Sequence, residues 1–235
     1  MWRGRACGSV AAFAVAAAAA AGVGPQATAP APGQVRVSVT LVGSDGSKRP
    51  APDAVAWLPG ALEPESASVA AAKIAQQHKA FEPHVEVVSA GSTVAFPNYD
   101  RIYHNVFSLS EIARFDLGLY RNGASRSVTF AKPGVIRIYC NIHPSMSAFL
   151  VVVEGRAYAK TPASGIAVLP PVKPGTYRLR VWHERGGQKD LDVAVRPGAV
   201  TAVEVSLDAS RWRPESHRNK YGKDYPPPDD DQTRY

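Results

Sequence analysis

Residues 139–146 read Tyr139-Cys140-Asn141-Ile142-His143-Pro144-Ser145-Met146, and the rest of the chain can be ordered around them. Cys140 is one of only 2 cysteines, and the other, Cys7, lies near the N-terminus. Met146 is the only methionine besides Met1, and His143 is one of 6 histidines. A thiol, an imidazole and a thioether thus stand together in one short stretch, which indicates a metal site that needs one further imidazole.

This donor set is the one that copper uses for electron transfer. A thiolate and two imidazoles in a near-trigonal plane, with a long axial thioether, suit both Cu(I) and Cu(II). Cys140-x-x-His143-x-x-Met146 can supply three of these ligands from one loop between adjacent strands. The second imidazole must come from a distant strand, and His104 follows the loop after a predicted strand at 92–96. We therefore predict one type 1 copper ion bound by His104, Cys140, His143 and Met146.

Three of the four ligands also have a purely structural interpretation. Taken alone, His104 could be a structural histidine, Met146 could fill the core and Cys140 could be a buried free thiol. Zinc is the rival metal, but zinc prefers a further Cys, His or carboxylate where Met146 stands. The other histidines are weaker candidates, because His78 and His84 precede the strand at 92–96 and His183 and His217 belong to the C-terminal module and tail. His84 and His183 are expected to be exposed or locally hydrogen-bonded.

Residues 1–33 have the layout of a secretory signal peptide. Arg3 and Arg5 form a basic start, and the alanine-rich apolar run at 11–23 is short for a membrane span. The alternative is an uncleaved anchor. Cleavage would remove Cys7 and leave Cys140 as the single thiol of an exported, periplasmic chain without a membrane span. A lone thiol in an oxidising compartment is explained if a metal occupies it.

The net charge of +7 does not indicate nucleic-acid binding. The excess of basic residues is spread thinly along the chain, with no basic run and no interleaved stacking aromatics. We therefore expect no nucleic-acid partner.

Short alternating segments separated by Gly and Pro turns predict an all-β sandwich. Residues 61–73 fit either a loop or a short helix, and 110–119 fit a helical turn or a bulged strand. The predicted strands are 34–42, 54–58, 74–81, 85–88, 92–96, 104–107, 125–130, 135–139, 148–153, 166–169, 176–182, 191–195 and 200–207.

The strands divide the mature chain into several parts. We predict an N-terminal β segment at 34–60, a metal-binding domain at 61–156, a smaller β module at 157–209 and a disordered charged tail at 210–235. The module at 157–209 has only about four strands, which are few for the formation of an independent hydrophobic core. We therefore hypothesise that residues 34–58 complete this module and that the metal-binding domain is inserted between its halves.

With these motifs in place, the chain resembles a cupredoxin of the amicyanin/plastocyanin kind. The resemblance covers residues 74–154 and lies in Phe81-Glu82-Pro83, the segment 91–98, His104-Asn105-Val106, Lys132-Pro133-Gly134 and the loop 140–146. Over roughly 35–185 the chain is similar to exported bacterial methylamine utilization proteins, which add a carboxypeptidase-regulatory or transthyretin-like segment. Tyr177-Arg178-Leu179-Arg180-Val181-Trp182-His183 carries that part.

The resemblance implies a fold and several residue roles. It implies a cupredoxin Greek-key β-sandwich plus a smaller β-sandwich segment. His104 would be buried, and Asn105 would hydrogen-bond across to the cysteine loop. The edge of His143 would reach the surface in an apolar patch with Pro144 and Phe149.

The predicted function is one-electron transport between periplasmic redox partners. A dehydrogenase or a c-type cytochrome would dock near His143. We predict that the protein is not an enzyme, because the sequence has no His-x-His pair for a second copper. Two alternatives stay open: copper handling without electron transport, and a β-sandwich interaction protein whose site has decayed.

Overall fold

The computed structural model describes residues 1–2, 29–61, 71–214 and 217–225. These residues form eighteen β-strands and no α-helix. The predicted signal peptide falls largely on residues 3–28, which lie outside the described residues. In the described part of the chain, no helix is long and apolar enough to cross a bilayer.

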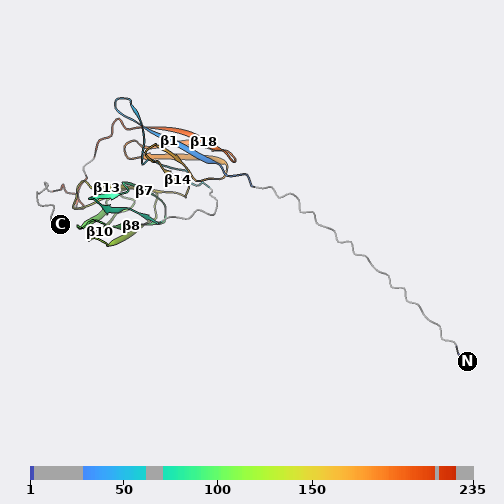
Figure 1. Cartoon of the computed structure of the whole chain (residues 1–235), viewed down its shortest axis with the longest axis horizontal. Helices are drawn as coiled ribbons and strands as arrows, with labels where there is room; N and C mark the ends of the chain where they lie inside the picture. The colour runs from blue at the N-terminus through green and yellow to red at the C-terminus, as the bar shows by residue number, and fades with distance from the viewer. Residues whose placement is uncertain (3–28, 62–70, 215–216, 226–235) are drawn as a thin grey trace.

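Two groups of strands, each with its own core, make up the fold (Figure 1). We call residues 34–58 with 157–208 the flanking module, and residues 72–153 the inserted module. In Figure 1 the flanking module contains β1, β14 and β18, and the inserted module contains β7, β8, β10 and β13.

The flanking module joins segments from both ends of the chain. β1 lies between β15 and β18 and pairs in parallel with β18 from Gln34↔Val200 to Val42↔Asp208. One core unites buried residues on both sides of the insertion, such as Val37 and Val205. Its first sheet contains β15 (Ile166–Val168), β1 (Gln34–Val42), β18 (Val200–Asp208) and β2 (Lys48–Pro50). Its second contains β14 (Tyr158–Lys160), β3 (Val55–Trp57), β16 (Gly175–His183) and β17 (Gly187–Val195).

The inserted module is a sandwich of a larger and a smaller sheet. Phe96 of the smaller sheet and Ile138 of the larger are both fully buried in its core. The larger sheet runs β10 (Phe115–Tyr120), β9 (His104–Ser108), β12 (Gly134–Tyr139), β13 (Ser147–Val153) and β7 (Val85–Ser89). The smaller runs β11 (Ser125–Phe130), β8 (Ser92–Pro97) and β4 (Ala72–Lys73), and β5 (Ala75–Gln77) pairs with β6 (Ala80–Glu82).

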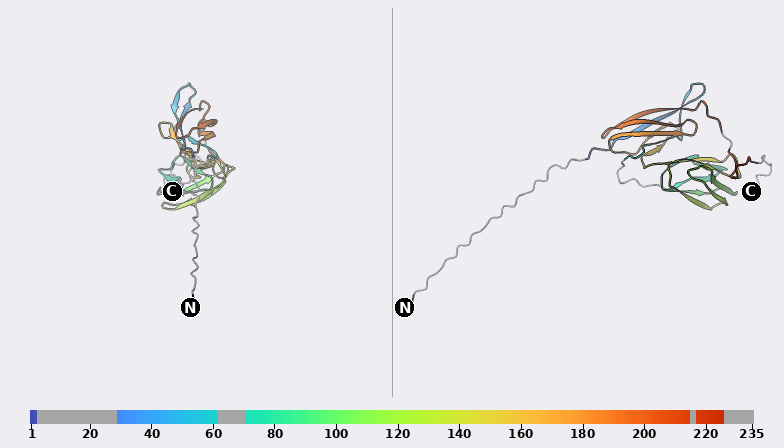
Figure 2. Two further views of the ribbon diagram at one scale, coloured as in Figure 1. Left: turned by 90° about the vertical axis from the view of Figure 1, so that its right-hand side faces the viewer. Right: turned by 180° about the vertical axis from the view of Figure 1, so that it is seen from behind.

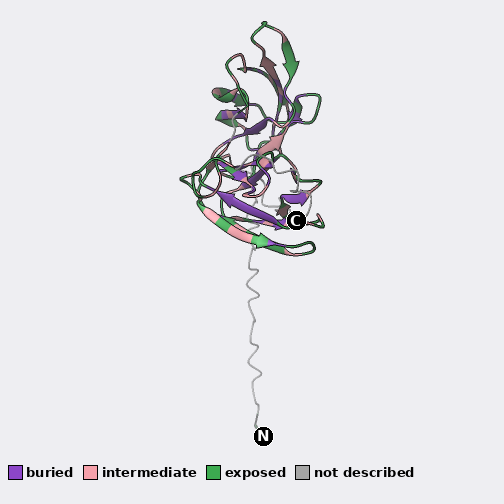
Figure 3. Cartoon of the chain, turned by 90° about the vertical axis from the view of Figure 1, so that its left-hand side faces the viewer, coloured by how far each residue is buried: buried purple, intermediate pink, exposed green. Residues whose placement is uncertain are grey.

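The larger sheet of the inserted module is covered on both faces. Leu150 of β13 faces the core of its own module, whereas Val151 packs in a third cluster with Trp57 and Trp182 of the flanking module. A strand buried on both faces loses the polar alternation of a half-exposed strand, which explains the nearly all-apolar sequence of β13. Figure 3 shows buried strands at the contact between the modules and a more exposed strand at the outer edge.

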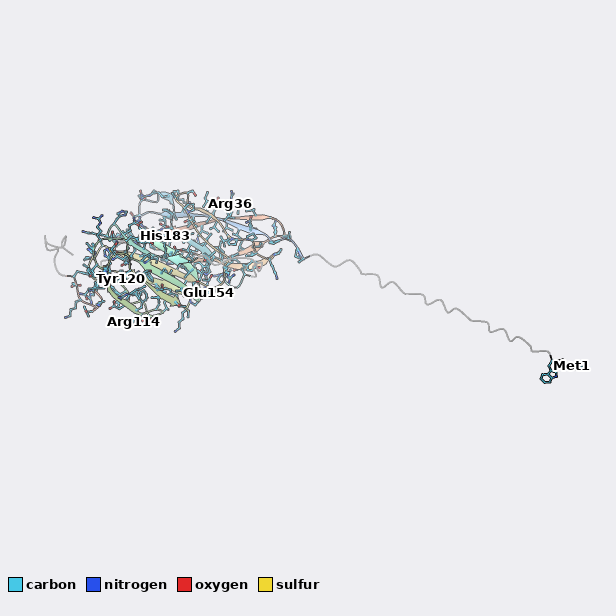
Figure 4. The ribbon with its side chains drawn as sticks, turned by 60° about the horizontal axis from the view of Figure 1, so that its bottom comes forward. Met1, Arg36, Arg114, Tyr120, Glu154 and His183 are labelled. Atoms are coloured by element: carbon cyan, nitrogen blue, oxygen red, sulfur yellow. The ribbon has the colours of Figure 1, made fainter. Side chains whose placement is uncertain are left out.

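Side-chain contacts reinforce this interface. Glu154, which directly follows β13 of the inserted module, accepts from Trp57 Nε1 (3.3 Å) and lies 3.5 Å from Arg180 Nη1 of the flanking module. In Figure 4, Glu154 and His183 lie between Arg36 at one outer edge and Arg114 at the other. The two modules are therefore packed together rather than merely tethered.

The predicted all-β fold is confirmed, with several local differences. Residues 74–81 are not one strand: His78 (φ 57) and Lys79 (φ 54) form a turn between β5 and β6. Of the two predictions for 110–119, the bulged strand agrees better with the structure, because the register between β9 and β10 shifts between Asp116 and Leu119. The three-residue strands β2 and β14 were not predicted. Of the segment 61–73, residues 62–70 lie outside the described residues.

Candidate metal centre

The loop 140–146 connects two adjacent antiparallel strands. β12 ends at Tyr139, which pairs with Ser147 at the start of β13. Inside the loop, Met146 N donates to His143 O (3.0 Å) and Cys140 N donates to Met146 O (3.3 Å). These bonds fold the loop back on itself, so that its three predicted ligands belong to one compact turn.

β9 brings the distant imidazole to this loop. Tyr139 of β12 pairs with Phe107 of β9, which places the start of β9 beside the end of β12. His104 Nδ1 lies 3.9 Å from Cys140 Sγ, and His143 Nδ1 also lies 3.9 Å from this sulfur. The ligand atoms of the three residues are all within 4.8 Å of one another. The structure therefore brings together His104, Cys140 and His143, although His104 and Cys140 are 36 residues apart in sequence.

Burial separates the four predicted ligands into two kinds. His104 and Cys140 are 0 % exposed and Met146 is 1 % exposed, whereas His143 is 9 % exposed. Met146 packs in the same core cluster as Cys140. The histidine of the loop is thus the ligand that lies nearest to the surface.

The chemistry of these donors fits copper. Burial, with the nearby His104 and Lys79, lowers the pKa of His143 to about 4, so its ring is neutral and able to coordinate at neutral pH. Ile142 N donates to Cys140 Sγ at 3.4 Å, which supports a thiolate. A thiolate and two imidazoles beside a buried thioether match the set that binds copper in electron-transfer sites.

The remaining histidines are elsewhere. His78 is exposed and lies 3.6 Å from Glu82, and His183 is buried and accepts from Arg185 N (3.0 Å). His84 contacts Glu184 of the flanking module. None of the three belongs to the cluster of donors found among the described residues.

Asp100 holds the buried imidazole from behind, a contact that sequence reasoning missed. His104 Nε2 lies 2.8 Å from Asp100 Oδ2, and with Nδ1 turned to the metal site, Nε2 is the nitrogen that donates. Asp100 also accepts from His78 N (2.7 Å) and Lys79 N (2.9 Å), so it ties the β5–β6 turn to the site. Burial raises the pKa of Asp100, but the hydrogen bonds from Lys79, His104 and His78 outweigh it and lower that pKa overall.

Asn105 does not make the predicted side-chain bond to the cysteine loop. Its Nδ2 donates to Asp116 Oδ1 (2.6 Å), and its Oδ1 is buried without a partner in the described part of the chain. The reason is the bulge in β10. It turns Asp116 back, so that the carboxylate also accepts from Gly118 N (2.8 Å) and meets the amide of Asn105.

Phe149 is also displaced from its predicted place near His143. Its ring lies 5.4 Å from Trp182 and 5.6 Å from His84, in the contact between the modules. Residues alternate between the faces of a strand, and Phe149 is on the face of β13 that the flanking module covers. Pro144, by contrast, is exposed directly after His143.

Residues 217–225, which we call the C-terminal segment, are folded against the metal loop. His217 stacks on Tyr139 with centroids 4.0 Å apart, and Tyr225 Oη donates to Cys140 O (2.7 Å). Lys220 N donates to Asn141 Oδ1 (2.9 Å). The prediction of disorder for 210–235 is therefore wrong for this segment, while residues 215–216 and 226–235 lie outside the described residues. Ring side chains such as His217 and Tyr225 occur in this charged stretch, but their sequence positions do not indicate what they contact.

No family model and no curated protein sequence matches the chain. Among solved structures, it is similar to a purple cupredoxin from Nitrosopumilus maritimus, at 24% identity and TM-score 0.32, covering 34% of this chain and 98% of that one. A Cu(I) form of a mutant amicyanin matches at 24% identity and TM-score 0.34, covering 41% and 97%.

A Cu-containing nitrite reductase from Thermus scotoductus SA-01 matches at 24% identity and TM-score 0.35 over 41% of this chain. The match spans only 25% of that enzyme. At these scores, likeness does not assign this chain to a family or give it a function.

Proposed function

We propose that the chain is an exported, cupredoxin-like copper protein that carries one electron between redox partners. The observation that supports this most directly is the convergence of two imidazole Nδ1 atoms on Cys140 Sγ, each at 3.9 Å. Met146, buried in the same cluster, completes the proposed ligand set. A copper ion bound there would supply reversible one-electron chemistry.

The residues around the site favour electron transfer because they restrict rearrangement. His104 is fixed by Asp100, and the loop is closed by the bond from Met146 N to His143 O. The complete burial of His104 and Cys140 excludes water from that side of the site. Little movement between oxidation states is the main requirement for a carrier, since no bond is made or broken.

His143 is the residue through which we propose that electrons enter and leave. It is the most exposed of the four ligands, and the neighbouring Pro144 is exposed as well. A dehydrogenase or a c-type cytochrome that docks over His143 would come closer to the proposed metal than one that docks over a fully buried ligand. We propose that these partners are periplasmic, because residues 1–33 have the layout of a secretory signal peptide.

We further propose that the protein catalyses no bond-forming reaction. The chain has 6 histidines and no His-x-His pair that could hold a second copper. Copper handling would use the same four ligands, so it is distinguished by experiment rather than by the ligand set.

The test is electron exchange by the copper-loaded protein. Reversible voltammetry, followed by stopped-flow mixing with a reduced c-type cytochrome, should show fast exchange. His143→Ala should slow exchange per copper-loaded molecule at least about tenfold, a loss equivalent to about 1.4 kcal/mol in the barrier. His78→Asn is the control, because Asn tolerates the positive φ of this exposed position. Copper uptake without reversible voltammetry would instead support copper handling.

A further inference from the structure

A cavity of about 670 Å³ lies between the two modules, on the side of the cysteine loop. Arg137 and Tyr139 of β12 line one wall, and Phe149 of β13 lies beside them. The flanking module contributes Arg185 from the β16–β17 turn, and the chain after β18 contributes residues 211–214. Figure 2 shows this last part of the chain running from the flanking module toward the inserted module.

The described residues that line this cavity carry more positive than negative charge. Among them the arginines are Arg137, Arg185, Arg211 and Arg213, and the carboxylate is that of Glu184. Glu184 is already engaged, because His84 Nε2 lies 2.6 Å and Arg185 Nε 3.2 Å from its oxygens.

Two of the arginines make no close ion pair with a described residue. Within the described ranges, neither Arg211 nor Arg213 has a carboxylate at ion-pair distance. Arg213 Nη1 instead donates to two backbone carbonyls, those of Trp212 (2.8 Å) and Ser210 (3.4 Å). Among the described residues, the only carboxylate shown to feel either charge is that of Asp208, whose pKa Arg211 helps to lower.

Aromatic rings orient the other two guanidinium groups. Arg185 lies over the ring of Trp212, 4.7 Å from its centroid, and Arg137 lies 5.8 Å from that of Phe149. Such contacts reduce the freedom that an arginine must lose when it binds a ligand. The volume is within the range of small-molecule sites.

We propose that this cavity binds a small anion that carries carboxylate or phosphate groups. Guanidinium groups form paired hydrogen bonds with both kinds of group, which is why arginine is common where they are recognised. Arg185 belongs to the flanking module, and residues 211–213 follow its last strand. The proposal therefore also gives the flanking module a role near the metal loop.

The site is placed to influence the metal centre. Tyr139 directly precedes Cys140, and Ser147, which also lines the cavity, directly follows Met146. A bound anion stabilises the oxidised, more positive form of a neighbouring copper centre and therefore lowers its reduction potential. By linkage, the oxidised form would bind the anion more tightly. This coupling rests on the proposed function, whereas anion binding itself does not.

The first experiment is calorimetric titration of the metal-free full chain with citrate and, separately, inorganic phosphate at low ionic strength. Saturable binding is expected, and comparison of the two probes distinguishes a carboxylate from a phosphate ligand. Arg211→Gln with Arg213→Gln should weaken binding at least about tenfold, since hydrogen bonds to charged groups are lost.

The matched control is Arg36→Gln with Arg196→Gln, which removes the same charge from exposed positions outside the cavity. It should change affinity less than about twofold if binding is local rather than a general charge effect. The proposal is overturned if neither probe binds saturably to the unaltered chain, or if both double variants weaken binding equally. The indole N–H resonance of Trp212 gives a second readout that needs no variant: it should shift with citrate, and an unmoved signal at saturation contradicts the site.

A third measurement tests the coupling to copper. Saturating citrate should lower the reduction potential of the copper-loaded protein and of the Arg36/Arg196 control, but not that of the Arg211/Arg213 variant. If the protein binds no copper, calorimetry still decides the anion site, so the two proposals fail independently. An equal shift in all three proteins would overturn the coupling.

Discussion

At the residue scale, His104 depends on Asp100 for its orientation. The carboxylate accepts from His104 Nε2 at 2.8 Å and is itself held by backbone N–H groups of His78 and Lys79. Carboxylates behind a metal-binding histidine fix its ring and raise its basicity. The same carboxylate places a negative charge close to the proposed metal.

Asp100→Asn should therefore weaken copper binding about tenfold or more and raise the reduction potential. The asparagine keeps the size of the side chain but removes its charge. Competition with a copper chelator gives the affinity, and voltammetry gives the potential. Asp45→Asn, at an exposed turn, is the control. Equal affinities and potentials in the Asp100 variant and the unaltered protein would show that Asp100 does not act on the site.

Met146→Leu should retain copper and shift the reduction potential upward. In the proposed site the thioether would be a weak ligand, and leucine fills a similar volume in the core without being able to donate to a metal. Copper stoichiometry and voltammetry measure the two effects. Loss of copper binding would contradict the weak axial role of Met146.

The sequence alone predicts the proposed ligands whose spacing along the chain is characteristic of a metal-binding loop. Cys140, His143 and Met146 occur in one loop, and their chemistry points to copper without further context. Asp100 behind His104, Asp116 opposite Asn105 and His217 over Tyr139 are tertiary contacts between separate segments. No local pattern encodes such contacts.

At the element scale, β1 joins the two ends of the chain. It pairs with β15 on one side and with β18 on the other, about 166 positions away in sequence. Val37 is fully buried in the shared core, whereas the adjacent Arg36 points outward. We propose on this basis that residues 34–58 complete the C-terminal module and that the metal-binding part is an insertion.

Val37→Asp should destabilise the flanking module by several kcal/mol, because it buries a carboxylate that has no partner. Arg36→Asp introduces the same side chain one position away on the outer face of β1 and should cost much less. Thermal unfolding followed by circular dichroism compares the two. Similar melting temperatures for both variants would contradict the central place of β1 in the core.

Strand prediction succeeded where alternation or an apolar run is long enough to be distinctive, as in β1 and β13. It failed for β2 and β14, which have only three residues each and exist because a neighbouring strand pairs with them. It also missed the turn at His78 and Lys79, since neither residue type marks a turn as Gly or Pro does. The Asp100 carboxylate accepts both of their N–H groups.

At the scale of the whole molecule, the two modules are joined by an apolar cluster and by a charged contact. His84 of the inserted module lies 2.6 Å from Glu184 of the flanking module, and its Nδ1 lies 3.2 Å from Ser147 O. The hydrogen bond to Glu184 is the main cause that raises the pKa of His84 above its ordinary value of 6.5. Protonated His84 therefore stabilises the folded protein.

This contact predicts a pH-dependent stability. A raised pKa contributes stability fully below the unfolded value near 6.5, and the contribution is lost as pH rises through the folded pKa. His84→Asn should lower the melting temperature more at about pH 5.5 than at about pH 8.5. The corresponding difference in the free energy of unfolding should be less than about 1 kcal/mol, because the pair is partly exposed. His78→Asn, at an exposed histidine, is the control. A difference that grows toward alkaline pH would contradict the sign.

We propose that Cys140, with His104, His143 and Met146, forms a type 1 copper site. The visible spectrum of the purified protein after addition of Cu(II), recorded beside that of Cys140→Ser, is the measurement that decides this. We predict an intense blue charge-transfer band from the thiolate that is absent from the variant. A colourless protein, or a band that persists without the Cys140 sulfur, would contradict the claim.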